Sequence, residues 1–316
     1  MKTKGLVFGH AIGDALGVPV EFEPRAALSA DPVREMRGFG AHPVPAGAWS
    51  DDTSMTLCLL DSLAECGCID HKDIMERFVR WYEKAEYTPT GAMFDIGIAT
   101  RQALTRYMRG TAPLLCGGRG DHDNGNGSLM RIAPLALYLH KKRGKNLSAE
   151  DMRDVHEVSM LTHAHVRSQM ACGIYVLIAV RLLEGNNIKD AIRDGLGAAY
   201  GFYRDRAEFA DELVTYARLW KVAEFAALPE NRIKSGGYVV DTLEAVLWCL
   251  MNTESYKSCV LKAVNLGEDT DTVGAIAGGL AGLAYGWDSI SPEWVRGLLR
   301  ADYIGELCDK FVAALK

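Results

Sequence analysis

The chain has 316 residues, of which 48% are hydrophobic and 24% are charged, and its formal net charge is −6. This length and composition suit a globular protein with one large core or two smaller ones. The negative charge argues against nucleic acid as a partner, because a surface that binds nucleic acid normally carries a basic stripe.

The predicted first helix carries glycine at every fourth position, at Gly5, Gly9, Gly13 and Gly17. Glycine inside a helix costs about 0.5–1 kcal/mol relative to alanine. A neighbouring helix that packs at short distance against this row of glycines, here called a glycine ridge, compensates for the cost. The spacing therefore predicts tight helix packing that holds the adjoining loops rigidly.

A long segment rich in Pro and Gly, residues 23–49, leads to the first acidic cluster, Ser50-Asp51-Asp52-Thr53. An apolar run with helical spacing follows, at Leu57, Leu60 and Leu63. Ser and Asp are preferred helix caps, so capping is one explanation of the cluster. Crowded carboxylates also require a compensating cation, and oxygen ligands without Cys or His select Mg²⁺, Mn²⁺ or Ca²⁺. For this cluster alone, both explanations stay open.

The remaining periodicity is helical almost throughout. A helix is expected around Ile74, Phe78, Trp81 and Tyr82. Further helices are predicted at residues 95–108, 129–141, 149–161, 165–184, 188–200, 207–220, 238–251, 256–265, 293–299 and 302–315. Clear alternating strand patterns are absent. We therefore predict an all-α fold, formed as one compact domain over residues 1–316.

Three motifs between these helices carry polar groups that packing alone does not require. Asp95, in Phe94-Asp95-Ile96-Gly97, is either an N-cap or a general acid whose pKa is raised by its apolar neighbours. The loop at 111–127 ends in Gly125-Asn126-Gly127-Ser128-Leu129-Met130-Arg131, where glycine amides and a helix start can receive an anion such as phosphate. Ordinary Gly-Ser capping is the alternative, and Pro134 would delay the helix. The histidines of Thr162-His163-Ala164-His165 do not share a helix face, which argues against a zinc pair.

The second acidic cluster, Asp269-Thr270-Asp271-Thr272, precedes the most apolar run of the chain, residues 273–285. This run is shorter than the roughly 20 residues that cross a bilayer, so we expect a buried core helix and no membrane contact. It carries a second glycine ridge, formed by Gly274, Gly278, Gly282 and Gly286. Because the two acidic clusters match in composition, we predict that they are two halves of one site, with four aspartates for two divalent metal ions.

The eight cysteines are scattered, and no signal peptide precedes the first helix. We therefore expect a cytoplasmic protein with reduced thiols. Cys66-Gly67-Cys68 with His71 lacks a second cysteine pair at suitable spacing, so no zinc site is predicted there.

Taken in order along the chain, these motifs resemble the ADP-ribosylglycohydrolase family, and in particular its bacterial arginine-directed type. The resemblance covers nearly the whole chain, from about Gly5 to Gly286. It runs through Gly13-Asp14-Ala15-Leu16-Gly17 with Glu21, both acidic clusters, Phe94-Asp95-Ile96-Gly97, residues 125–131, Thr162-His163, Gly237-Tyr238-Val239-Val240-Asp241-Thr242 and residues 265–274.

The resemblance implies an orthogonally packed helical fold with two Mg²⁺ or Mn²⁺ ions at the base of an ADP-ribose cleft. The implied metal ligands are Ser50, Asp51, Asp52, Asp269, Asp271 and Thr272. The implied substrate-binding residues are Gly125, Asn126, Gly127 and Ser128 at the diphosphate, His163 and Tyr238 near the adenosine or distal ribose, and Met130. Asp95 and Glu21 are the implied catalytic acids, and the family does not fix which one is the general acid and which the base.

The implied reaction is hydrolysis of the bond between C1 of the distal ribose and an arginine side chain of a modified protein, with ADP-ribose as product. In such a reaction two metal ions orient the sugar and a water molecule, and a carboxylic acid protonates the leaving group. Serine, a small guanidine compound or a nucleic-acid base are alternative leaving groups. A catalytically silent ADP-ribose binder, like the crystallins that resemble this family, is a further alternative, although such a binder has no need of four metal-binding aspartates. The protein is expected to act as a monomer.

Overall fold

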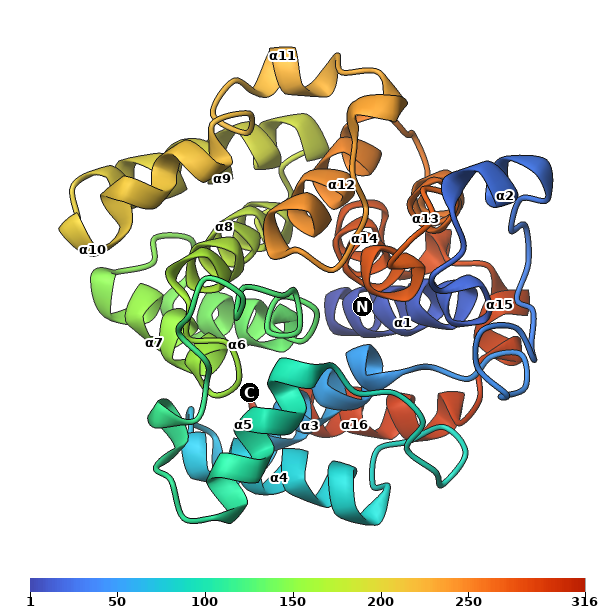
Figure 1. Cartoon of the computed structure of the whole chain (residues 1–316), viewed down its shortest axis with the longest axis horizontal. Helices are drawn as coiled ribbons and strands as arrows, with labels where there is room; N and C mark the ends of the chain where they lie inside the picture. The colour runs from blue at the N-terminus through green and yellow to red at the C-terminus, as the bar shows by residue number, and fades with distance from the viewer. Residues whose placement is uncertain (316) are drawn as a thin grey trace.

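Helices form the regular structure of the chain in this computed structural model, which describes residues 1–315 (Figure 1). Within these residues there are sixteen α-helices, five short 3₁₀ helices and two isolated β-bridges, and no strand. The predicted all-α class is confirmed. In chain order the α-helices are α1 (Lys2–Gly17), α2 (Arg25–Ala30), α3 (Asp51–Cys66), α4 (His71–Lys84), α5 (Ile98–Met108), α6 (Ala133–Arg143), α7 (Ala149–Met160), α8 (Val166–Leu183), α9 (Ile188–Arg204), α10 (Ala207–Ala210), α11 (Val222–Ala226), α12 (Val239–Met251), α13 (Tyr256–Val264), α14 (Thr270–Tyr285), α15 (Pro292–Gly297) and α16 (Ala301–Ala314).

Helices α1 and α14 lie side by side and antiparallel near the middle of the molecule (Figure 1). A Cβ atom added at Gly9 would lie 2.4 Å from the carbonyl oxygen of Gly278, and one at Gly13 would lie 2.0 Å from that of Gly274. Real Cβ atoms do not approach a backbone so closely, so only glycine permits this separation of the two helices. The two glycine ridges predicted from the sequence therefore pack against each other.

This antiparallel register brings the end of α1 to the beginning of α14. A Cβ atom at Gly17 would lie 2.3 Å from the Cα atom of Asp271, and the Thr270 hydroxyl donates a hydrogen bond of 2.8 Å to the carbonyl of Gly17. The second acidic cluster is thus fixed against the last turn of α1.

Helix α8 is the one helix of the described chain that is long and apolar enough to cross a membrane, by length and composition only. Its 18 residues have a mean hydropathy of 1.4, but 72% of them are buried inside the protein. A core helix passes the same test, and α8 packs against α6, α7, α9 and α12. It is a core helix of this fold.

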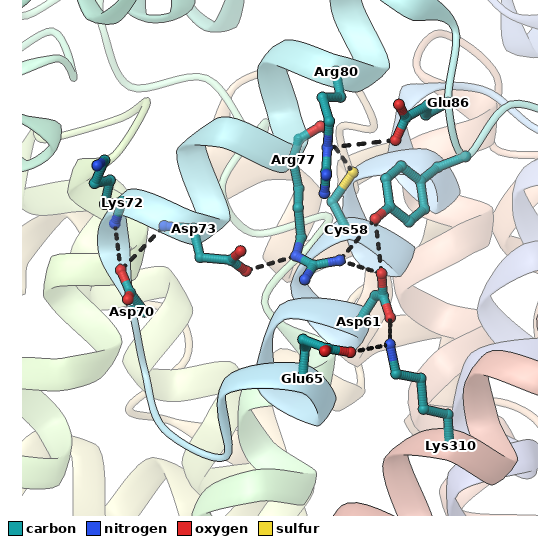
Figure 2. Close-up of polar contacts among 11 residues, drawn as sticks. Cys58, Asp61, Glu65, Asp70, Lys72, Asp73, Arg77, Arg80, Glu86 and Lys310 are labelled. Carbon is teal, nitrogen blue, oxygen red and sulfur yellow. Dashed lines mark hydrogen bonds and ion pairs between the residues drawn. The ribbon is translucent and has the colours of Figure 1, made fainter.

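A buried ion-pair network ties α3, α4 and α16 together (Figure 2). The Arg77 guanidinium donates to Asp61 on α3, to Asp73 one turn earlier on α4, at 2.6 Å, and to the Tyr87 hydroxyl, at 2.9 Å. Lys310 of α16 donates to the other oxygen of Asp61, at 2.8 Å. Every buried charge in this network has a partner, which is the condition under which ion pairs are tolerated in a core. The network holds α3, the helix that carries the first acidic cluster, in place.

Several predicted helix bounds are wrong, for local reasons. The helix expected at 95–108 begins at Ile98, because Gly97 is its N-cap, and Asp95 therefore does not cap it. The helix expected at 129–141 begins at Ala133, with Pro134 in its first turn. The segment 207–220 breaks after Ala210 into a 3₁₀ helix, where Glu212 binds the side chain of Arg167 instead of facing solvent along a continuous helix. The short helices α2 and α11 were not expected.

Candidate functional site

The two acidic clusters face one cavity of about 470 Å³. A larger surface groove of about 830 Å³, beside α4 and α5, is lined by side chains of both charges and has no such cluster, so size alone does not locate the site. The cavity is lined by these predicted site residues: Glu21, Asp51, Asp52, Asp95, Gly125, Asn126, Gly127, Met130, His163, Asp269, Asp271 and Thr272. Ser50, Ser128 and Tyr238 are the predicted site residues that do not line it.

The clusters touch each other directly, although more than 200 residues separate them in sequence. The Thr272 hydroxyl, in the first turn of α14, donates to Asp52 Oδ2 at 3.3 Å, and the Ser50 hydroxyl donates to the same oxygen at 3.1 Å. Ser50 is also the N-cap of α3, and its hydroxyl accepts from the Asp52 amide at 3.3 Å. Helix capping and a place at the site are therefore compatible roles for this serine.

Asp14, on α1, fixes the beginning of α3 from outside that helix. Its Oδ1 accepts from the Ser50 amide at 2.9 Å, and its Oδ2 accepts from the Thr53 amide at 3.0 Å and from the Thr53 hydroxyl at 2.6 Å. Asp14 is fully buried, and burial raises its pKa to about 7, while these hydrogen bonds act in the opposite direction. We did not predict this role. A lone acid within a helix of glycine and apolar residues is the signal that could have indicated it.

Burial and mutual repulsion raise the pKa of the carboxyl groups at the cavity. The pKa values of Asp51, Asp52 and Asp271 lie well above the usual range, because these groups are buried and face other carboxylates. The pKa of Asp269 is also raised by burial. Within residues 1–315, no Lys or Arg forms an ion pair with any of these four aspartates. The site thus concentrates carboxyl groups whose ionised forms have no compensating Lys or Arg in the described chain.

The donor set fits a divalent cation. Asp52 Oδ1 is buried and has no hydrogen-bond partner in the described chain, which is a costly state for a carboxylate oxygen unless a cation binds it. Carboxylate oxygens of Glu21, Asp269 and Asp271 all lie within 4.8 Å of one another, close enough to share one ion. Oxygen donors of this kind suit Mg²⁺ or Mn²⁺.

Glu21 follows the 3₁₀ turn after α1 and forms a pair with His42, which the sequence did not single out. The His42 Nε2 atom lies 2.5 Å from Glu21 Oε2, and one oxygen of Asp95 lies within 4.8 Å of both groups. Burial raises the pKa of Glu21, and the hydrogen bond to Glu21 raises the pKa of His42. The next residue, Phe22, has a left-handed backbone with φ of 67° and is 70% exposed beside the cavity. No sequence signal could have found His42, because it lies in an irregular loop.

The glycine turn at Gly125 is held by the loop before α12. The Asn126 amide donates to the carbonyl of Gly237 at 3.1 Å, and the Asn126 side chain donates to Asp269 Oδ2 at 2.7 Å. Asn126 thereby ties the turn to the second acidic cluster. The expected helix start directly after this turn is wrong, since α6 begins at Ala133.

Two predicted substrate-binding residues lie behind this turn instead of on the cavity wall. Ser128 is fully buried, and its hydroxyl accepts from the Ser159 hydroxyl at 2.8 Å. Tyr238 is half-buried as the N-cap of α12, where its backbone bridges to Gly125. In this structure both residues support the turn.

His163 reaches the cavity and His165 does not. A Cβ atom at Gly127 would lie 2.7 Å from His163 Cε1, so the imidazole lies directly on the glycine turn. His165 is the N-cap of α8 and accepts from the Arg167 amide at 3.2 Å. His163 therefore forms part of the cavity wall, whereas His165 caps a helix.

The all-α fold, with two acidic helix starts that meet at one cleft beside a glycine turn, agrees with the family resemblance seen in the sequence motifs. The family model described as ADP-ribosylglycohydrolase matches residues 1–316, and the chain belongs to this family. The family expected from the sequence motifs is confirmed, and with it the expectation that the protein is an enzyme.

Similar proteins support this placement over almost the whole chain. The chain is 36% identical over 312 residues to ADP-ribosylarginine hydrolase Tri1 of Pseudomonas putida, covering 98% of this chain and 77% of that protein. It is 33% identical over 302 residues to ADP-ribosyl-[dinitrogen reductase] glycohydrolase of Rhodospirillum rubrum, covering 94% of this chain and 90% of that protein. A solved structure titled ADP-ribosylglycohydrolase-related protein complex superposes with a TM-score of 0.81 at 31% identity and covers 100% of this chain and 98% of its own.

Proposed function

We propose that this enzyme is a metal-dependent hydrolase that removes ADP-ribose from modified arginine side chains of proteins. The observation that carries the proposal is the meeting of two buried acidic clusters in one cavity, where Asp52 Oδ1 has no partner in residues 1–315. The choice of arginine is supported by relatives at 33–36% identity that are named ADP-ribosylarginine hydrolases.

In this proposal six side chains would hold two Mg²⁺ or Mn²⁺ ions: Ser50, Asp51, Asp52, Asp269, Asp271 and Thr272. Glu21, which lies within 4.8 Å of Asp269 and Asp271, is left for proton transfer. When bound, such ions neutralise the carboxylates and orient oxygen ligands by Lewis acidity. The protein contributes the rigid placement of the ligands, because α1 and α14 hold one cluster and Asp14 holds the other.

The chemical step breaks the bond between C1 of the distal ribose and the arginine nitrogen. The oxygen of a water molecule bonds to C1, and the departing guanidine receives a proton. Glu21 is suited to hold that proton, because burial raises its pKa and His42 fixes its orientation. Asp95, on the same side of the cavity, is the partner carboxylate that accepts the proton of the water. The reverse assignment, with Asp95 as the acid and Glu21 as the base, would use the same two carboxylates.

A turnover assay across linkages tests the proposal. Purified protein with Mn²⁺ or Mg²⁺ is expected to release ADP-ribose from an arginine-modified protein faster than from serine-modified protein, an ADP-ribosylated guanidine compound or a modified nucleic-acid base. Chelation with EDTA is expected to abolish release. Asp271→Asn keeps the side-chain shape and removes one charge, so it is expected to lose activity while circular dichroism stays unchanged.

Each other outcome has a distinct meaning. Faster release from another linkage would contradict arginine as the leaving group but would still support a metal-dependent hydrolase of an ADP-ribose linkage. Binding of ADP-ribose without any turnover, unaffected by EDTA, would instead support the silent binder and contradict the proposal.

A further inference from the structure

Behind the cavity lies a buried cation without a carboxylate partner, Arg131. Its side chain is fully buried, and its guanidinium stacks over the Phe78 ring at 4.8 Å. Two of its nitrogens, Nε and Nη1, have no hydrogen-bond partner in the described chain. Its Nη2 donates to the carbonyl of Val158 at 3.2 Å and to the Thr162 hydroxyl at 2.7 Å. Unpaired buried charge is costly, so a benefit elsewhere is expected from this arrangement.

The Thr162 hydroxyl that accepts from Arg131 also contacts the next residue, His163. Thr162 Oγ1 lies 2.9 Å from His163 Nδ1, and these two contacts are the only hydrogen bonds of the Thr162 hydroxyl within residues 1–315. A guanidinium can only donate, so Thr162 Oγ1 accepts from Arg131. Its own proton is then left for His163 Nδ1, which must act as acceptor.

The alternative tautomer leaves a proton without an acceptor. If His163 carried its proton on Nδ1, that N–H would also point at Thr162 Oγ1, and the Thr162 hydroxyl proton would be buried and unsatisfied. Leaving a buried donor unsatisfied is unfavourable, because its lost hydration is not replaced. The hydrogen bonds of the Thr162 hydroxyl therefore favour the His163 tautomer that carries its proton on Nε2.

Nε2 is the ring nitrogen that lies against the glycine turn. It has no hydrogen-bond partner in the described chain, and it lies 3.6 Å from the place where a Cβ atom of Gly125 would be. His163 lines the cavity together with Gly125 and Gly127. An N–H donor at Nε2 therefore points at whatever occupies the glycine turn.

We propose that Arg131 and Thr162 are positioning residues that hold His163 in the Nε2–H tautomer, so that it presents a neutral N–H donor to an acceptor oxygen of ADP-ribose. The acceptor role of the ligand rests on the proposed function, whereas the tautomer does not. Burial lowers the pKa of His163 to about 3, and the Arg131 charge acts in the same direction, so the ring stays neutral. Burial lowers the pKa of Arg131 to about 10, which still leaves it charged at neutral pH.

The tautomer is measured directly in the ligand-free protein by NMR of ¹⁵N-labelled histidine, with His163→Gln used to assign the signal. The wild type is expected to show a protonated Nε2 and an unprotonated Nδ1. Thr162→Val keeps the side-chain shape but has no hydroxyl, so it is expected to give a mixture of tautomers. Thr162→Ser restores the hydroxyl and is expected to restore the single tautomer.

Affinity for ADP-ribose is measured by calorimetry on the same variants. Thr162→Val is expected to weaken binding about tenfold, which is the range of one lost hydrogen bond to an oriented donor, and Thr162→Ser much less. Thr105→Val serves as the control, because the Thr105 hydroxyl only binds the carbonyl of Arg101 on the outside of α5. An Nδ1–H signal in the wild type, or an unchanged tautomer in Thr162→Val, would overturn the positioning role. Lack of ADP-ribose binding by the wild type would instead count against the proposed function, while the NMR result decides the tautomer by itself.

Discussion

At the scale of single residues, Asp14 shows how a helix far along the chain sets the geometry of the site. The beginning of α3 needs partners for its first amides, and a cap normally comes from the adjacent residue. Here Ser50 supplies one such partner, and Asp14 supplies two more from α1. Because the carboxylates of Asp51 and Asp52 project from this same turn, the Asp14 contacts fix the direction of the first cluster.

Replacement of Asp14 by Asn is expected to destabilise the protein and weaken its affinity for metal. Asn offers one acceptor oxygen where Asp14 uses two, and its NH₂ group would face the amide or hydroxyl of Thr53. Loss of a buried acceptor costs about 1–3 kcal/mol in the free energy of unfolding. Urea denaturation measures that energy, and Mn²⁺ titration measures the affinity.

Asp70→Asn is the matched control for this substitution. Asp70 also caps a helix, by accepting from the amides of Lys72 and Asp73, but it is exposed and lies away from the cavity. Asn and Asp are nearly equal as N-caps, so little change is expected. Equal effects of Asp14→Asn and Asp70→Asn would contradict a special role for the buried aspartate.

At the scale of elements, the contact between α1 and α14 determines whether the two acidic clusters meet. Gly13→Ala places a methyl group 2.0 Å from the carbonyl oxygen of Gly274, so the helices must separate. Overpacking of this kind costs about 1–3 kcal/mol or more, and it outweighs the roughly 0.5–1 kcal/mol that alanine contributes as a better helix former. We expect lower stability in urea together with weaker Mn²⁺ binding, because Asp269 and Asp271 move with α14.

Two glycines of α9 provide the control for the helix contact. Gly197 and Gly201 have no atom within 4 Å of an added Cβ, so alanine there gains helix propensity without a clash. Gly197→Ala is expected to leave stability unchanged or to raise it slightly, and to leave metal binding unchanged. A loss of stability in Gly197→Ala as large as in Gly13→Ala would show that helix contact is not the cause.

At the scale of the whole molecule, the sequence predicted local features well and long-range contacts poorly. Hydrophobic periodicity was enough to predict the all-α class, and the glycine ridges were enough to predict tight helix packing. The two acidic clusters stood out because packing gives no reason for so much charge. The pairing of His42 with Glu21, the burial of Ser128 and the capping by Asp14 could not be predicted, because each depends on the distance between segments that are far apart in sequence.

The charge gathered at the cavity makes the stability of the whole protein depend on pH and metal together. The pKa values of Asp51, Asp52, Asp269 and Asp271 are raised in the folded state above the ordinary 3.8. Folding therefore favours their protonated forms, so their contribution to stability is fully present below about pH 4 and is lost as the pH rises through the raised values. A bound divalent cation offsets this loss of stability at higher pH, since it favours the ionised carboxylates.

Thermal unfolding with EDTA and with Mn²⁺ at pH 5 and pH 8 measures this coupling. A ligand at one hundred times its Kd stabilises the folded state by about 2.7 kcal/mol, and protons compete with the metal for the same oxygens at low pH. We therefore expect Mn²⁺ to raise Tm clearly more at pH 8 than at pH 5. Asp271→Asn removes one titrating ligand, so it is expected to raise Tm at pH 8 in EDTA while shrinking the increase that Mn²⁺ produces. A Tm that does not respond to Mn²⁺ at pH 8 would mean that the clustered carboxylates hold no cation, which would contradict the proposed metal site.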